Sequence, residues 1–429
     1  MKTITTLLLI LTSFGVFGQN DLSLSDAIAI GLKNNYDLEI TRKDEKIAAL
    51  NNSWGNAGAL PSISFNVTGY EDYNFNDDED YRIQSVSPDV SLSWVVFNGF
   101  SAKITKQKLE ELEEQSKGNT AILVENTIQD IILAYNSCLL EKALTDVYKE
   151  LSDLSEDRYQ RAENSKEIGA STTYESLQAK TSWLEDQSNY LQQKVNYENA
   201  IRSLNYILAV EDNTIWNLTS ELEIDTPAYD LDDLSARLLE NNQTLRNQYL
   251  SQSLAAKETA LTKSNFYPSL TFSSEVDQNW LDYYYQGSTG HYNSNSADVY
   301  VGLTLSFNIF NGGATRRNLQ VAQISEEMEQ VTTQQMKHSL NNQLLQLYST
   351  YNVQKAVLEL ANEQEAAAKL NLELSKEKLN SGAINSFNYR DVQITYMNAA
   401  VNRLQAIYNL IDSNTDLLRI TGGIISEYE

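Results

Sequence analysis

The residue types that most often carry chemistry are few in this chain, and they stand apart. His291 and His338 are the only histidines, and neither has a second histidine or a cysteine at the spacing of metal ligands. No glycine-rich phosphate loop and no nucleophile elbow occurs. We therefore expect no catalytic residues, no metal site and no cofactor, and we predict that the protein is not an enzyme.

Two further groups also favour structural roles. Cys138 is the only cysteine and is followed by Leu139 and Leu140, so we expect a buried, unreactive thiol without a disulfide partner. The acidic run 77–80 has side chains that bind calcium elsewhere, but it lacks the spacing of a known calcium loop. We interpret this run as solvated charge in a loop.

Acidic residues outnumber basic ones by 58 to 32, which gives a formal net charge of -26. Such a chain is not expected to bind nucleic acid or anionic lipid headgroups. The excess charge fits either a solvated, self-repelling surface or the lining of an acidic lumen.

Residues 1–18 have the pattern of a signal peptide. Lys2 supplies the positive end, an apolar core follows, and Val16 and Gly18 are small enough for a cleavage site. We expect the mature chain to begin near Gln19 and to be exported.

The rest of the chain consists of two copies of one unit. Early in each copy the matching residues are offset by 207, and later they are offset by 213. The earlier pairs include Asn34 with Asn241, Leu38 with Leu245, Pro61 with Pro268 and Phe65 with Phe272. We assign residues 19–210 to the first repeat, 211–230 to a linker or equatorial region, and 231–429 to the second repeat.

Each repeat contains two stretches in which apolar and polar residues alternate, the pattern of strands with one apolar and one wet face. The expected strands are 61–73, 88–97, 268–281 and 297–310, joined within each repeat by polar loops at 72–87 and 282–296. A soluble β-sandwich would show the same alternation. Strands in lipid leave no open edge, and four are too few to enclose an aqueous lumen, so several chains would have to pool them. Three chains would supply twelve strands.

Long helices account for most of the remaining sequence. Residues 99–166 and 314–381 contain almost no glycine or proline, and each would span roughly 100 Å as a helix in a coiled coil. Shorter helices are expected at 22–58 and 172–210, and turns at Gly169 and Gly382. The predicted fold class is mainly α with a small β part.

This arrangement resembles the TolC-like outer membrane efflux family over nearly the whole mature chain. The resemblance is carried by the entry segment 22–35, the strand starts at Pro61 and Pro268, the Phe-Asn-Gly segments at 97–99 and 310–312, and the glycine turns. It implies a homotrimer with a twelve-stranded barrel in the lipid of the outer membrane and a helical tunnel in the periplasm. It also implies an exit duct for efflux or type I secretion, fed by an inner-membrane pump through a periplasmic adaptor protein.

In this family, acidic residues just after the glycine turns line the tip of the tunnel. Matching from the turns places Glu175 and Asp391 there, which would make a ring of six carboxylates that favours cations. Two ordinary solvated helix acids remain the alternative. Leu379 and Ile384 stand where a tyrosine and an arginine latch the tip in well-known members, so closure is expected to use apolar packing, with Arg390 as a substitute partner. The adaptor would dock around Gly169 and Gly382, over 167–174 and 380–387.

Two other classes of protein have to be weighed. A structural or adhesive coiled-coil protein of the cell surface, held by a β-barrel anchor, would need the same strands and helices. It would not need the duplicated half-length helices and their turns. An outer-membrane enzyme would need a constellation of reactive side chains, and none is evident in the sequence.

Overall fold

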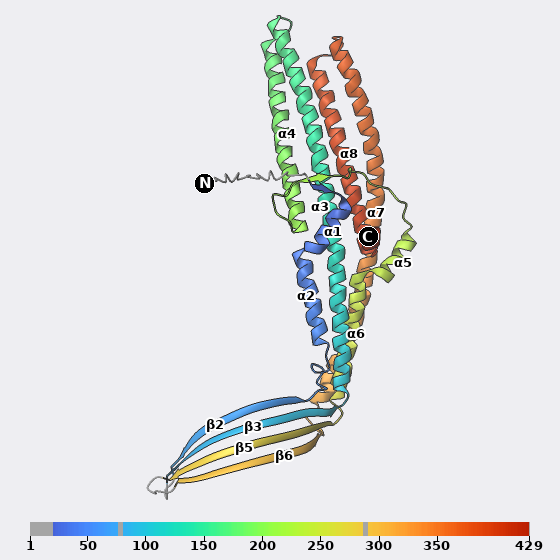
Figure 1. Ribbon diagram of the computed structural model, residues 1–429. Coiled ribbons are helices and arrows are strands. Elements are labelled where there is room, and N and C mark those ends of the chain that lie inside the picture. The colour runs from blue at the N-terminus through green and yellow to red at the C-terminus, as the bar shows by residue number, and fades with distance from the viewer. Residues whose placement is uncertain (1–19, 76–79, 286–290, 429) are drawn as a thin grey trace, which may run out of the picture. The chain divides into compact units, whose positions relative to one another are not determined.

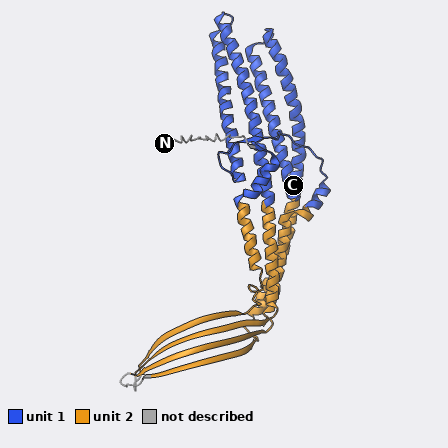
Figure 2. Cartoon of the chain, viewed as in Figure 1, with its two compact units in different colours: residues 1–36, 124–237, 343–429 blue, residues 37–123, 238–342 orange. Residues whose placement is uncertain are grey.

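The computed structural model describes residues 20–75, 80–285 and 291–428. The predicted signal peptide lies outside these ranges, as does most of the acidic run 77–80. The chain divides into two compact units (Figure 2). Unit 1 comprises residues 1–36, 124–237 and 343–429, and unit 2 comprises residues 37–123 and 238–342.

Helices make up most of the described chain (Figure 1). In the first half of the chain they are α1 (Leu24–Asn34), α2 (Tyr36–Asn51), α3 (Ser101–Glu167) and α4 (Thr173–Leu208). In the second half they are α5 (Leu231–Asn241), α6 (Gln243–Ser264), α7 (Ala314–Asn380), α8 (Ser386–Ile420) and α9 (Ile424–Tyr428).

The helix boundaries follow the two sequence offsets. Helices α1 and α5 both have 11 residues and begin at Leu24 and Leu231, 207 positions apart. Helices α3 and α7 both have 67 residues and begin at Ser101 and Ala314, 213 positions apart. The change of offset therefore falls between these helices, in the strand region, as the six-residue difference in the sequence indicates.

The long helices begin and end within two residues of the predicted limits, but the helix predicted at 22–58 is two helices. The break is at Asn35, whose backbone is extended (φ -55°, ψ 127°) and whose side chain donates to the carbonyl oxygen of Ile207 at 3.5 Å. An asparagine that bonds elsewhere competes with the helical hydrogen-bond ladder, which accounts for the break.

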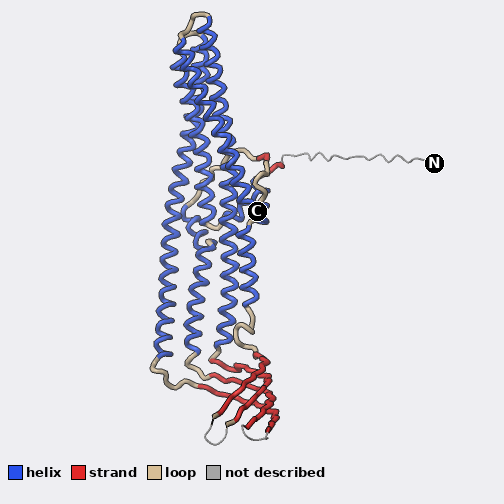
Figure 3. Tube along the Cα trace, turned by 90° about the vertical axis from the view of Figure 1, so that its left-hand side faces the viewer, coloured by secondary structure: helices blue, strands red, loops and turns tan. Residues whose placement is uncertain are grey.

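Unit 2 contains a four-stranded antiparallel sheet in the order β2-β3-β5-β6 (Figure 1), drawn as the red strands in Figure 3. The strands are β2 (Ser62–Asn74), β3 (Tyr81–Asn98), β5 (Ser269–Tyr285) and β6 (His291–Ser306). The strands are longer at the hairpin ends than predicted, so most of the expected loops at 72–87 and 282–296 is strand. The last strand ends at Ser306, four residues before its predicted end.

In unit 2, the helices follow one another as neighbours in the order α2, α3, α6, α7, and hydrogen bonds join each helix to the next. Asn52 of α2's end donates to Glu113 of α3 at 2.6 Å, and Gln115 of α3 donates to Ser251 of α6 at 2.8 Å. The same α6 meets α7 through Gln248, which donates to Glu329 at 3.0 Å. The four helices thus form one layer, in which α3 and α6 have a neighbour on both sides and α2 and α7 lie at the ends.

Unit 1 contains a short parallel pair that the sequence did not reveal, β1 (Asn20–Leu22) with β4 (Trp216–Leu218). Its surroundings are the best buried part of the unit. The fully buried Tyr135 donates its hydroxyl to the carbonyl oxygen of Leu22 at 2.8 Å, and the indole of Trp216 donates to Asn205 at 2.6 Å. These bonds hold β1 against α3 and the linker against α4.

Candidate functional site

Both helical hairpins of unit 1 turn at a glycine with a left-handed backbone. Gly169 has φ +75° and Gly382 has φ +76°. After Gly169, the amide of Ala170 donates to Ser165 at 2.7 Å, and Gly169 itself donates to Lys166 at 3.0 Å. The second turn repeats this pair of bonds, which is the Schellman arrangement that ends a helix on glycine. The predicted turns are therefore present at both positions.

Glu175 lies in the first turn of α4, where it closes a capping box. The Thr172 hydroxyl accepts from the Glu175 amide at 3.2 Å, and the Glu175 carboxylate accepts from the Thr172 amide at 3.4 Å and from the Ser171 hydroxyl. One role of this carboxylate is thus to begin the helix. The same bonds hold its negative charge beside the turn.

Asp391 lies in the second turn of α8, which begins after the N-cap Asn385. Its side chain is exposed to solvent, and its backbone carbonyl accepts from Thr395 at 2.8 Å. Glu175 follows Gly169 by six residues and Asp391 follows Gly382 by nine, so each hairpin has one of these carboxylates in the first two turns of its second helix.

Arg390, which the sequence suggested as a partner near Asp391, is bound elsewhere. Its two terminal nitrogens donate to the two carboxylate oxygens of Asp186 on α4, at 2.6 and 2.7 Å. The Asp186 side chain is 3% exposed and that of Arg390 is 14% exposed. This fork-to-fork ion pair joins the α3–α4 hairpin to the α7–α8 hairpin.

A second arginine beside this pair was not identified from the sequence. Arg158 of α3 is buried, and its guanidinium lies in the electrostatic field of both Asp186 and Arg390. Burial first, and then the charge of Arg390, lower the pKa of Arg158 to about 10, while Asp186 opposes the shift. No sequence signal links these three residues, because Asp186 and Arg390 are 204 positions apart.

Apolar residues pack close to the second turn, at the two positions for which the sequence predicts apolar contacts. Leu379 and Ile384 are partly buried against a cluster that includes Leu372, Tyr389 and Tyr396. These contacts lie within one chain, and closure of a tunnel tip by apolar packing stays a prediction.

The sheet of unit 2 has one apolar and one polar face. On the apolar face, Phe65, Val90, Val276 and Val299 share one register row, with one residue from each strand. Phe65 is 67% exposed and Val299 is 72% exposed. So large an uncovered apolar surface marks a face that meets a partner or lipid.

The polar face carries carboxylates. Asn66, Asp89, Asp277 and Asp298 form one register row across all four strands, and Asn66 donates to Asp89 at 3.0 Å. Within the four strands the only lysine or arginine is Arg82, and strand alternation places it on the opposite face. The charged groups on this face are therefore all acidic.

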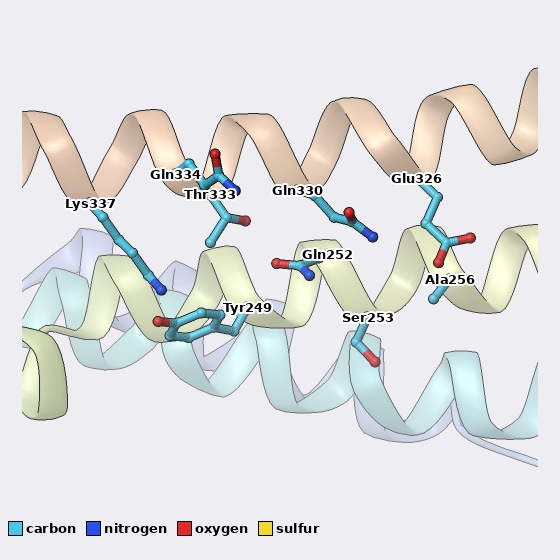
Figure 4. A pocket seen from close by; sticks show the side chains of 9 residues that line it. All are labelled: Tyr249, Gln252, Ser253, Ala256, Glu326, Gln330, Thr333, Gln334 and Lys337. Atoms are coloured by element: carbon cyan, nitrogen blue, oxygen red, sulfur yellow. The ribbon is translucent and has the colours of Figure 1, made fainter.

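A polar groove of about 470 Å³ runs between α6 and α7 in unit 2 (Figure 4). Tyr249 and Gln252 of α6 face Gln330 and Lys337 of α7, and the Lys337 ammonium lies 5.0 Å from the centre of the Tyr249 ring. Its lining of amides and charged groups fits a helix surface in contact with water.

Two of the single reactive groups noted in the sequence, His338 and Cys138, have described side chains. His338 is exposed on α7, and Cys138 is fully buried on α3. No group of three or more histidine, cysteine or acidic side chains able to hold a metal ion occurs among the described residues. None of the helices described combines the length and apolar composition that crossing a membrane requires.

Comparison with known proteins identifies a matching family model and solved structures with a similar fold. Residues 234–423 match the family model described as outer membrane efflux protein. A search among curated protein sequences found no match. Solved structures with a similar fold include the Campylobacter jejuni CmeC outer membrane channel, with 17% identity and a TM-score of 0.77 over 93% of this chain and 85% of that chain.

Two further structures give the same result. CusC, described in connection with transmembrane channel formation, has 14% identity and a TM-score of 0.78 over 94% of this chain and 93% of its own. The open state of the Neisseria gonorrhoeae MtrE outer membrane channel has 15% identity and a TM-score of 0.73, over 93% and 89%. The resemblance to the outer membrane efflux protein family is thereby confirmed: residues 234–423 carry its domain, and the chain as a whole has the fold of outer membrane channels.

Proposed function

We propose that three copies of this chain form an exit duct of the outer membrane, with the strands in the membrane and the helices as a periplasmic tunnel. The observation that carries the proposal is the sheet, which is apolar on one face, acidic on the other, and open at both edges. Strands β2 and β6 each pair on one side only among the described strands. In lipid, open edges have to be paired, and a second copy offers β2 to β6.

The helices of unit 2 support assembly in the same way. On α7, Val321, Ile324, Met328 and Val331 are spaced by three and four residues and are 57 to 64% exposed. At 100° per residue this stripe lies opposite the side that faces α6. Helix α2, at the other end of the four-helix layer, exposes Ile40, Ile47 and Leu50. A copy placed beside the first would bury the α7 stripe against the α2 stripe.

The acidic groups supply the selectivity of the duct. In a trimer the polar face of the sheet would line the lumen, and Glu175 and Asp391 would add six carboxylates near the hairpin turns. Negative charge around a narrow passage favours cations over anions. The proposed cargo path is therefore aqueous and cation-preferring.

Partners complete the proposal. An inner-membrane pump and a periplasmic adaptor would deliver cargo for efflux or type I secretion, with the adaptor docking around Gly169 and Gly382. Exposed apolar side chains at both turns support this surface: Ile168 is 81%, Tyr174 69% and Phe387 42% exposed. A photo-crosslinker at Ile168 should capture the adaptor in cells, and one at Tyr206, which is equally exposed, should not. Equal capture at both positions would show that the adaptor does not dock specifically around the turns.

Planar lipid bilayers test the duct itself. The purified protein should give stepwise conductance with a cation-selective reversal potential, and the double variant Glu175→Gln/Asp391→Asn should shift that potential toward zero. Glutamine keeps the acceptor oxygen of the capping box, so the change tests charge and not folding. Glu198→Gln, an exposed acid farther along α4, is the control.

Each outcome has a separate meaning. Absence of conductance in protein that is folded by circular dichroism would overturn the duct and favour the surface structural or adhesive protein. Conductance with an unchanged reversal potential in the double variant would remove Glu175 and Asp391 from the constriction and leave the duct in place.

A further inference from the structure

A small cavity lies inside unit 1, where the two helical hairpins meet. Its volume is about 20 Å³, and its walls come from α3, α7 and α8. The charged residues of the lining are Asp157, Arg158, Arg161 and Lys376. A space of this size accommodates one water molecule or one monatomic ion, and it excludes phosphate, sulfate and carboxylates.

Arg158 is the buried member of this lining. The residue is 7% exposed, and its Nε and Nη2 atoms have no hydrogen-bond partner within the described part of the chain. The nearest buried carboxylate, Asp186, already receives both terminal nitrogens of Arg390. A buried guanidinium with unmatched donors is strongly destabilising unless something accepts those bonds.

The charge around the cavity is also unbalanced. The carboxylate of Asp186 lies in the field of two arginines, the buried Arg158 and the largely buried Arg390, and its two oxygens accept hydrogen bonds from Arg390. At the exposed rim, Arg161 donates to the neutral Asn380 at 2.8 Å, and Lys376 adds a further positive charge. Asp157 is the only acid in the lining, so cations outnumber anions here although the chain as a whole is acidic.

We propose that this cavity is a binding site for a single chloride ion, held by Nε and Nη2 of Arg158. A halide accepts several N–H donors and adds the negative charge that the cluster lacks, whereas a water molecule would accept the bonds and leave the charge unbalanced. Burial and, after it, the positive charge of Arg390 lower the pKa of Arg158, and that positive charge favours a bound anion. Because the walls belong to both hairpins, the ion would join α3 to α7 and α8. The site is independent of the duct function proposed above.

Crystals of the wild-type protein grown in bromide test the site directly. The expected result is a bromide anomalous peak within hydrogen-bonding reach of Nε or Nη2 of Arg158. A wild-type structure with Arg158 well ordered and no anomalous peak beside it would overturn the proposal. This experiment needs no variant and does not depend on channel activity.

Thermal unfolding gives a second test in solution. At equal ionic strength, the wild type should melt about 2–4 °C higher in chloride than in gluconate, since a ligand that binds only the folded state raises its stability. Arg158→Met should abolish the difference, and Arg202→Met, at an exposed arginine of α4, should retain it. A wild-type protein that melts at the same temperature in chloride and in gluconate would contradict the assignment. So would an Arg158→Met protein that keeps the difference.

Discussion

At the scale of single residues, the buried ion pair between Arg390 and Asp186 is the strongest polar link between the hairpins of unit 1. Both side chains are largely buried and the pair is bidentate. Removing one member of such a pair leaves an uncompensated buried charge, and here Arg158 adds a second one.

Asp186→Asn is therefore expected to lower the free energy of unfolding by about 3–5 kcal/mol. Urea unfolding followed by circular dichroism measures the loss. The matched control is Glu198→Gln, which breaks the exposed pair between Glu198 and Arg202 and should cost no more than about 1 kcal/mol. If the two variants unfold alike, the Asp186 pair does not hold the hairpins together.

Cys138 gives a prediction about protonation. Burial is the main cause that raises the pKa of its thiol to about 12, from an ordinary value of 9.0. The folded state therefore keeps its proton where the unfolded state loses it, so this contribution to stability is complete below pH 9 and declines as the pH rises from 9 to 12. Iodoacetamide at pH 8.5 should label Cys138 at least ~100-fold more slowly in the native protein than in urea. Rapid native labelling would show that the thiol is neither buried nor shifted.

The partners and roles of single residues were the features that the sequence predicted least well. Spacing and the family resemblance placed Glu175 and Asp391 near the turns, where they lie. The partner of Arg390 could not be inferred, because contacts across 204 positions leave no local pattern. Arg158 was missed for the same reason: an isolated arginine on a long helix looks like a solvated one.

At the scale of elements, close contact between α3 and α6 depends on Gly118. A Cβ at this position would lie 1.9 Å from Oδ1 of Asn247. Asn247 in turn donates to the Gln115 carbonyl at 3.3 Å and to Asn119 at 2.7 Å. Because Gly118 has no side chain, Asn247 of α6 can make these hydrogen bonds, which fix the position of α6 along α3.

Gly118→Ala should destabilise the protein, although alanine is the better helix former. The gain in helix propensity is about 1 kcal/mol, and overpacking costs about 1–3 kcal/mol before the bonds of Asn247 are lost. Thermal melting should show a net loss of about 1–2 kcal/mol. Gly55→Ala is the control, since its Cβ would meet nothing closer than 3.8 Å. A more stable Gly118→Ala protein would refute the close contact.

The ends of the long helices were predicted well, but the helix expected at 22–58 already ends at Asn51, and the hairpin ends of β3, β5 and β6 were predicted poorly. Glycine turns and long apolar periodicity mark helices within the segment itself, and α3 and α7 have their predicted limits to within two residues. The hairpin ends of the strands consist of Asn, Asp and Tyr, which are typical of loops. There the ladder of backbone hydrogen bonds continues regardless of side-chain type, so β3 begins at Tyr81 instead of residue 88.

At the scale of the whole molecule, the exposed stripe on α7 should be needed for assembly. Ile324→Lys/Val331→Lys places two charges in the middle of the proposed contact with α2 of the next copy, where burial would be costly. The variant should fold, because both side chains are exposed in a single chain, but it should elute as a monomer in mild detergent. The control is Glu326→Lys/Gln330→Lys, on the side of α7 that lines the groove. If the Ile324→Lys/Val331→Lys protein still elutes as a trimer, the contact between copies does not involve this stripe.

The duplicated sequence predicted the fold of a single chain well. Its assembly into several copies could only be argued from the unpaired strand edges and exposed apolar faces of one chain. The alternation of residues such as Phe65 and Asn66 gave the two faces of the sheet, and four strands were too few to enclose a lumen. The number of copies came from the family resemblance and not from any residue pattern.

The most direct test of the account is the mass of the protein extracted from outer membranes in mild detergent, corrected for bound detergent. The account predicts three polypeptides per particle, which is the assembly that would pair every β2 edge with a β6 edge. A folded particle containing one polypeptide would leave both edges of the sheet unpaired and would contradict the duct.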